Sequence, residues 1–219
     1  YTSADSNRMY FEIANSSGYK LIFNTNGGGA VTGATVVPLN QWNHVAVTRD
    51  SSNIIRIFLN GAVDATSSTY TASIQQTTPR IGSFANTPAY YFTGYISNLR
   101  VVSGTALYTS AFTPSTTPLT AVANTQLLTN QSNKFVDNSN NAFTITKSGE
   151  VAVSTVNPFG LNSGQSYYFD GTGDWLYGNP AQNIRPIQFS TGDYTVEYWV
   201  HPTNFTTAAT HTQIGRAHV

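Results

Sequence analysis

The sequence predicts an all-β protein in which two antiparallel sheets stack face to face. Aromatic residues make up 13% of the chain and charged residues only 9%, a balance typical of strands and turns rather than helices. Runs of β-branched and aromatic residues recur along the chain and are separated by short polar turns. In the run 54–59, apolar side chains lie on both faces of the strand, so a second layer must cover it.

Three strands follow one another in the later part of the chain's first third. The runs 42–48 and 54–59 are separated by the polar turn 49–53, which predicts a hairpin. Asn60 and Gly61 then favour the two positive φ angles of a type I′ turn, so the chain reverses again into a third strand.

The remaining first half adds a hairpin and a long strand. The runs 9–13 and 19–23 alternate in period two around the turn 15–18, and 27–29 is a glycine connection. The strand 91–102 carries apolar residues at an odd spacing. A bulge at Ser97 and Asn98 would turn both Ile96 and Leu99 toward the core.

The second half reads as short strands separated by Asn, Ser and Gly. Residues 112–120 contain two prolines and no apolar alternation, so they are interpreted as a linker or an extended segment along a sheet edge. The runs 167–169 and 175–177 flank a Gly-rich turn and predict another hairpin. The run 193–203 is the strongest strand, with Tyr, Val, Tyr and Val alternating on one face.

Bulk properties exclude several classes of partner. The formal net charge is zero with neither sign clustered, so the basic patch typical of nucleic-acid binding is missing. There is no cysteine, which excludes disulfides and thiolate metal sites. No apolar run approaches the roughly 18 residues of a membrane-spanning helix, so membrane insertion is not expected.

Five short motifs are spread along the chain: WNHVAVTRD at 42–50, FLNG at 58–61, FTGYISNLR at 92–100, FVDNS at 135–139 and YFDGTGD at 168–174. Together they resemble the laminin G-like jelly roll of the concanavalin A-like lectin and glucanase superfamily. The resemblance implies a jelly-roll sandwich and, because this fold hosts many activities, no single function. Tandem copies resembling these are familiar from phage tail-associated and bacterial surface proteins.

The order of the motifs implies a division of the chain. In the family, the motifs found here at the end of the chain open a domain and those found at its start close it. Residues 1–111 therefore resemble the C-terminal part of one repeat, 112–124 a linker, and 125–213 the N-terminal part of the next repeat. Since half a sandwich would expose apolar faces and strand edges, we expect the two parts to pack as one permuted sandwich. The alternative is two incomplete domains side by side. Residues 214–219 read as a non-native tail.

Catalytic patterns are missing from the sequence. A retaining glycosidase needs two carboxyl groups about 5–5.5 Å apart, and the glucanase branch carries its acids on alternate positions of one strand. No two acids of this chain stand two residues apart, and there is no Gly-x-Ser-x-Gly. Asp193 lies at a strand entrance, and Glu197 is expected to face solvent or to pair across the sheet. The chain is therefore predicted not to be an enzyme.

Calcium is the one cofactor that the pattern raises, because related domains often hold it and its ligands are loop oxygens. Asp170 and Asp174 flank a Gly-rich turn and could converge on an ion with the backbone near Asn98. The alternative is that both acids bind backbone amides of their own turn. Ser97 stands where the family often has Asp, which weakens the calcium reading. His44 is interpreted as a packed or hydrogen-bonded strand residue.

Carbohydrate is the predicted ligand class, because β-sandwich lectins stack sugars on aromatic side chains near loops. The candidate residues are Trp175 and Tyr177 after the acidic turn and Tyr90 and Tyr91 in the Pro88 loop. The predicted function is a non-catalytic carbohydrate-binding or adhesion module of a larger virion or cell-surface protein, beside neighbouring repeats. A structural spacer without a ligand is the alternative, and a glycan hydrolase is less favoured. The expected location is extracellular or on a virion surface.

Overall fold

The computed structural model describes residues 9–25, 30–76, 79–83, 91–161, 163–178, 187–205 and 211–216. These residues contain seventeen strands and a single 3₁₀ turn, η1 (Asn15–Ser17). The strands are β1 (Met9–Ala14), β2 (Lys20–Thr25), β3 (Val31–Val36), β4 (Asn43–Arg49), β5 (Ile54–Leu59), β6 (Ala62–Thr69), β7 (Ile74–Gln76), β8 (Pro79–Ile81), β9 (Thr93–Ser103), β10 (Thr125–Thr129), β11 (Ile145–Ser148), β12 (Ala152–Ser154), β13 (Ser166–Asp170), β14 (Trp175–Gly178), β15 (Ile187–Ser190), β16 (Tyr194–Pro202) and β17 (His211–Arg216).

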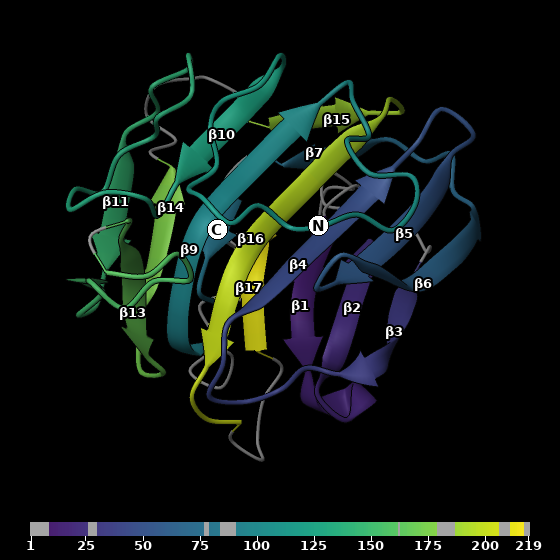
Figure 1. Cartoon of the computed structure of the whole chain (residues 1–219). Helices are drawn as coiled ribbons and strands as arrows, with labels where there is room; N and C mark the ends of the chain where they lie inside the picture. Colours follow the sequence, from purple (N-terminus) through teal and green to yellow (C-terminus); the bar gives the residue numbers. More distant parts are fainter. Residues whose placement is uncertain are drawn as a thin grey trace, which may run out of the picture.

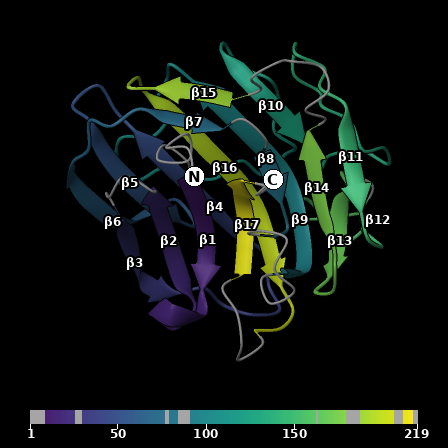
Figure 2. The same ribbon diagram turned by 180° about the vertical axis from the view of Figure 1, so that it is seen from behind.

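Two antiparallel sheets stack in layers, as Figures 1 and 2 show from opposite sides. One sheet has the order β11-β14-β8-β17-β1-β2-β3, and the other has the order β12-β13-β9-β16-β4-β5-β6, with β10 added on β9. The strands β7 and β15 form a separate pair. The predicted all-β jelly-roll sandwich is therefore confirmed. Within the described ranges, no helix is long and apolar enough to cross a membrane.

Strands from both ends of the chain share each sheet. β16 lies between β4 and β9 and pairs with both over most of its length. β17 lies between β1 and β8, and residues 214–216 pair there with β8. The late strands thus supply interior strands of sheets that the early strands begin. The division into two partial repeats, and the non-native origin of 214–219, remain interpretations.

The core fills the space between the sheets with alternate side chains of each strand. In β16, Tyr194, Val196, Tyr198 and Val200 are fully buried, as the period-two pattern predicts. Phe11 of β1 meets Tyr198 edge to face with ring centroids 5.6 Å apart. Each such side chain contributes about 1.5–3 kcal/mol on burial, so this interface holds the layers together.

Two local predictions are confirmed by the backbone. Asn60 and Gly61 have φ angles of 52° and 81°, as the type I′ turn between β5 and β6 requires. In β9, the register to β16 shifts beside Ser97 and Asn98, where Asn98 has a φ of 52°. This bulge leaves Ile96 and Leu99 both fully buried.

The predicted hairpin over 167–177 is wrong. β13 belongs to the eight-stranded sheet and β14 to the seven-stranded sheet, so the Gly-rich turn between them crosses from one layer to the other. Fully buried Asp174 holds this corner, because it accepts the backbone N–H of Asp170 at 2.9 Å and that of Glu150 at 2.6 Å. Because the buried carboxylate of Asp174 binds both of these backbone N–H groups, it favours a turn that crosses between the sheets over a two-stranded hairpin.

Residues 104–123, named here the strap, lie across the outer face of the eight-stranded sheet rather than along its edge (Figure 1). Thr48 donates to the carbonyl of Tyr108 at 2.8 Å, and the N–H of Leu107 donates to Thr195 at 2.8 Å. Most of the segment interpreted as a linker, 112–124, belongs to this strap. Within it, Phe112 packs against His44 of β4, and the carbonyl of Thr120 accepts a hydrogen bond from Arg100 of β9. The glycines 27–29 and the Pro88 loop at 86–89 lie outside the described residues.

Candidate functional site

Strand β14 places two of the predicted aromatic residues on one face. Leu176 is fully buried in the core, so its neighbours Trp175 and Tyr177 point to the outer side of the seven-stranded sheet, where both are partly exposed. The register places Tyr177 beside Arg80 of β8. The outer face here therefore carries two rings and a cation.

Tyr91 joins this group through a ring contact. Its ring lies nearly parallel to that of Trp175, with centroids 6.0 Å apart and an interplanar angle of 13°. The backbone of Tyr91 forms an isolated bridge with Ser83, which follows β8. Tyr91, Trp175 and Tyr177 are named here the aromatic platform.

Arg80 lies beneath the platform. Its guanidinium carbon is 4.6 Å from the centroid of the Trp175 ring, and the residue is only 4% exposed while Trp175 remains partly open to solvent. Burial lowers the pKa of Arg80, and the phenol groups of Tyr91 and Tyr177 oppose that shift. The cation–π contact places the Arg80 guanidinium against one face of the indole ring.

Hydroxyl groups border the platform on the neighbouring strand. The register of β11 with β14 places Thr146 opposite Tyr177 and Ser148 opposite Trp175. Both side chains are partly exposed and share the outer face with the rings. The site thus combines flat apolar rings with hydrogen-bonding groups.

Three of the four predicted aromatic residues are therefore brought together, and the fourth, Tyr90, lies outside the described residues. The sequence did not single out Arg80, Thr146 or Ser148. Period-two alternation could have assigned them to an outer face, but their adjacency depends on the pairing of β11, β14 and β8.

A second group of rings lies on the outer face of the other sheet. Trp42, Tyr95, Tyr168 and His201 contact one another with interplanar angles between 45° and 87°. Rings that meet edge to face pack well against one another but present no common flat surface. This cluster therefore serves packing better than stacking of a planar ligand.

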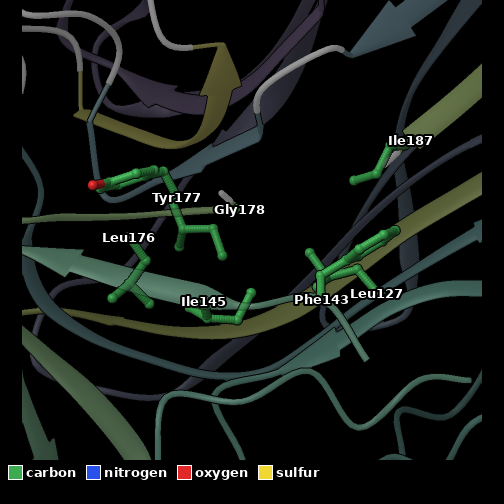
Figure 3. A pocket seen from close by; sticks show the side chains of 8 residues that line it. Leu127, Phe143, Ile145, Leu176, Tyr177, Gly178 and Ile187 are labelled. Carbon is green, nitrogen blue, oxygen red and sulfur yellow. The ribbon is translucent and has the colours of Figure 1, made fainter. Parts of the chain in front are cut away.

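A small apolar cavity lies inside the core behind the platform (Figure 3). Leu127, Phe143 and Ile145 line it together with Leu176 and Ile187, and Figure 3 shows the ring of Tyr177 pointing away from these side chains. Its volume of about 10 Å³ would hold about one water molecule. The cavity is thus a packing void and not a sugar site.

The proposed calcium ligands are not gathered. Both carboxylate oxygens of Asp174 accept hydrogen bonds from the backbone N–H groups of Asp170 and Glu150. The carboxylate of Asp170 accepts a hydrogen bond from the N–H of Thr172. Asn98 lies elsewhere in the fold, where its Oδ1 accepts the N–H of Leu119 at 2.8 Å. Among the described residues, no three His, Asp or Glu side chains cluster as a metal site would need. The arrangement does not fit calcium and matches the self-satisfied turn.

Glu197 is buried, so the expectation that it faces solvent is wrong, and the alternative that it pairs across the sheet is confirmed. Its Oε1 accepts Nε and Nη2 of Arg100 at 2.9 and 2.6 Å. Its Oε2 accepts the Tyr108 hydroxyl at 2.8 Å and lies 3.1 Å from Nε2 of His44. His44 is thus the packed, hydrogen-bonded strand residue that was predicted, and Tyr108 of the strap covers this carboxylate.

Comparison with known families gives one match. The family model Laminin_G_3, described as the concanavalin A-like lectin/glucanases superfamily, matches residues 1–111, which include β1 to β9. No curated protein and no solved structure matches the chain. The superfamily covers both sugar-binding and sugar-cleaving proteins, so membership supports a carbohydrate-binding or structural module in general terms. By this match and by its two-layer fold, the chain belongs to the concanavalin A-like lectin/glucanase superfamily.

Proposed function

We propose that this chain is a non-catalytic carbohydrate-binding module whose ligand stacks on the aromatic platform. The observation that carries the proposal is the near-parallel pair of Tyr91 and Trp175, supported from below by Arg80. A pyranose ring presents a flat face of C–H groups, and an aromatic ring buries that face without needing a deep pocket.

Polar and rigid groups around the rings support the same ligand. Thr146 and Ser148 offer hydroxyl groups at the border of the platform, where they can bind the equatorial hydroxyls of a stacked sugar. Arg80 fixes the indole ring before a ligand arrives, which reduces the entropy lost on binding. The platform is therefore suited to a neutral glycan.

Hydrogen bonds occupy the carboxylate groups of Glu197, Asp174 and Asp137, which supports a binding role over glycan hydrolysis. Glu197 and Asp174 are fully buried and hydrogen-bonded. Asp137 accepts four hydrogen bonds, three from Ser139 and Phe143 that follow it and one from the N–H of Leu128 in β10. A glycosidase needs one acid to donate a proton and a second to act across the scissile bond. The polar groups that the strand register and the ring contacts place beside the platform are the hydroxyls of Thr146 and Ser148 and the guanidinium of Arg80.

The biological setting we propose is a larger extracellular or virion-surface protein, in which the module lies beside other repeats and attaches the protein to surface glycans. A weak single site suits that setting, because repeated copies multiply the effective affinity. A spacer repeat without a ligand is the competing function.

A glycan array on the intact chain, followed by tryptophan fluorescence titration with the best ligand, tests the proposal. The chain has three tryptophans, so substitution can assign the signal. We expect Trp175→Phe and Tyr91→Ala each to weaken binding at least about tenfold, equivalent to about 1.4 kcal/mol. Trp42→Phe is the matched control, because Trp42 belongs to the edge-packed cluster and should leave the affinity unchanged.

Three outcomes would contradict the proposal. Binding to no glycan would favour the spacer. Equal losses in the Trp175 and Trp42 variants would place the ligand elsewhere. Release of reducing sugar from a β-glucan by the wild-type chain would show that the protein is a glycan hydrolase instead.

A further inference from the structure

The early part of the chain, β1 to β9, leaves one gap in each sheet. In the seven-stranded sheet β17 separates β8 from β1, and in the eight-stranded sheet β16 separates β9 from β4. Figure 1 shows the yellow strand β16 between β9 and β4. Both separating strands belong to the late part of the chain, β10 to β17. The early part therefore presents two slots, each one strand wide.

The slot for β16 is matched to that strand on three sides. The backbone of β16 pairs with β4 from Tyr194 to Val200 and with β9 on its other side. On the inner face, Tyr198 of β16 meets Phe11 of β1 edge to face. Alternate side chains of β16 thus enter the core that the early strands begin.

Two buried arginines of the early part use acceptors that the late part supplies. Arg49 of β4 is fully buried and donates to the carbonyls of Ser190 at 2.8 Å and Gly192 at 3.0 Å. Arg100 of β9 donates to the carboxylate of Glu197. A different strand in the slot would leave these buried guanidinium groups without those acceptors, which is costly. The slot is therefore selective for the sequence of β15 and β16.

The strap is the single chain connection between the two parts. Its ends meet, because the N–H of Ser103 donates to the carbonyl of Asn124 at 3.2 Å. Between these ends it lies on the outer face of the eight-stranded sheet (Figure 1). Fully extended, a segment of about twenty residues spans about 66–72 Å. The strap is thus long enough to carry the late part to a neighbouring molecule.

We propose that the early part of one copy accepts the late part of a second copy, so that two chains exchange β10 to β17 and form a swapped dimer. Each sandwich of this dimer contains the strand pairs and the buried ion pair of the monomer, and only the path of the strap differs. The partner is a second copy of this chain, recognised through slots that the chain's own late part already fits.

Concentration decides between the monomer and the swapped dimer. Within one chain, the strap holds the late part near its slot at an effective concentration on the order of millimolar. A dilute chain is therefore monomeric, and exchange needs either refolding at high concentration or copies held side by side. Neighbouring repeats in a surface protein would meet the second condition. The exchange needs no ligand, so it stands or falls independently of glycan binding.

Refolding two full-length variants together tests the exchange. Val47 of β4 and Val196 of β16 are fully buried and lie opposite one another, so Val47→Asp and Val196→Asp should each prevent folding. Exchange joins the early part of the Val196→Asp chain to the late part of the Val47→Asp chain and restores one intact sandwich for every two chains. We expect near-ultraviolet circular dichroism to recover in the mixture and in neither variant alone. The matched control is Val47→Asp with Ile57→Asp, both at fully buried early positions, whose mixture should stay unfolded.

Cross-linking tests the exchange in chains with an intact core, because the chain contains no native cysteine. Thr93 of β9 and Asp170 of β13 lie opposite one another, at a Cα separation that suits a disulfide. When Thr93→Cys and Asp170→Cys chains are unfolded together and refolded at high concentration, mild oxidation should link them. Without the unfolding step, we expect at least about tenfold less of this cross-link, because a folded chain releases its late part slowly.

Two outcomes overturn the proposal. One is a mixture of Val47→Asp and Val196→Asp that recovers no more structure than the control mixture. The other is equal cross-linking of the two cysteine variants with and without unfolding, since that would show collision between surfaces rather than exchange.

Discussion

Glu197 and Arg100 form a buried ion pair on the outer face of the eight-stranded sheet, beneath the strap. Glu197 is fully buried, and Nε and Nη2 of Arg100 both donate to its Oε1. Nη1 of Arg100 donates to the carbonyl of Thr120 at 2.8 Å, and Tyr108 donates its hydroxyl to Glu197. The ion pair thus joins β9 and β16 to two points of the strap, Tyr108 through Glu197 and Thr120 through Arg100.

We expect Glu197→Gln to destabilise the fold by about 3–5 kcal/mol, the usual cost of removing one partner of a buried ion pair. The amide nitrogen cannot accept the Tyr108 hydroxyl, and it leaves the Arg100 charge without a counterion. Urea denaturation followed by circular dichroism measures the loss. Asp50→Asn is the control, because the ion pair of Asp50 with Arg56 is nearer the surface and should contribute about 1 kcal/mol or less. Equal losses in the two variants would contradict this role of Glu197.

The stability difference between the wild type and Glu197→Gln should shrink in acid. Burial alone would raise the pKa of Glu197, but the hydrogen bond from His44, the charge of Arg100 and the Tyr108 hydroxyl hold it below its ordinary value of 4.5. A carboxyl with a depressed pKa contributes stability above that ordinary value and loses it as the pH falls through the folded-state pKa. Denaturation of both proteins from pH 7 to pH 3 measures the difference. Burial raises the pKa of Asp174, but this acts in both proteins and cancels.

The sequence could predict what depends on neighbouring residues. Asn60 and Gly61 define their turn locally, and the alternation of Tyr194 to Val200 assigns those side chains to the core without knowledge of β16's partners. The bulge at Ser97 and Asn98 follows from the odd spacing of two apolar residues on one strand. Each of these inferences needs only one element.

The sequence-based predictions are wrong where the local structure depends on contacts between segments that are distant in the chain. A Gly-rich turn fits both a hairpin and a crossing between layers, and only the position of Asp174 between Asp170 and Glu150 selects the crossing. The strap has no alternation because it is not a strand, yet it buries Glu197. The stacking of Tyr91 on Trp175 was not predictable as a contact, since it depends on β8 and β14 becoming neighbours.

Asp174→Ala should destabilise the corner between the layers. It leaves the backbone N–H groups of Asp170 and Glu150 without their acceptor, at about 1–3 kcal/mol for each group that water cannot reach. Exposed Asp170→Ala is the control and should cost less than about 0.5 kcal/mol. Thermal unfolding measures both variants.

The same unfolding experiment tests for calcium at this corner. Because both oxygens of Asp174 already accept backbone amides, neither calcium nor a chelator should shift the wild-type Tm. A calcium-dependent rise in Tm that Asp174→Ala abolishes would show a metal site there, since a ligand that binds only the folded state stabilises it.

Gly33→Ala should weaken the contact between β3 and β6. The new Cβ would overlap Oδ2 of Asp64, and the carboxylate can move away only by giving up its bond from the Thr35 N–H. We expect a loss of about 1–2 kcal/mol in the free energy of unfolding, near that of one hydrogen bond with added crowding. Gly192→Ala is the control, because the nearest atom to a Cβ there is a backbone oxygen at an ordinary 3.5 Å. A double-mutant cycle with Asp64→Ala isolates the cause: Gly33→Ala should cost markedly less once the carboxylate is gone, whereas an unchanged cost would place the strain against the Leu21 carbonyl instead.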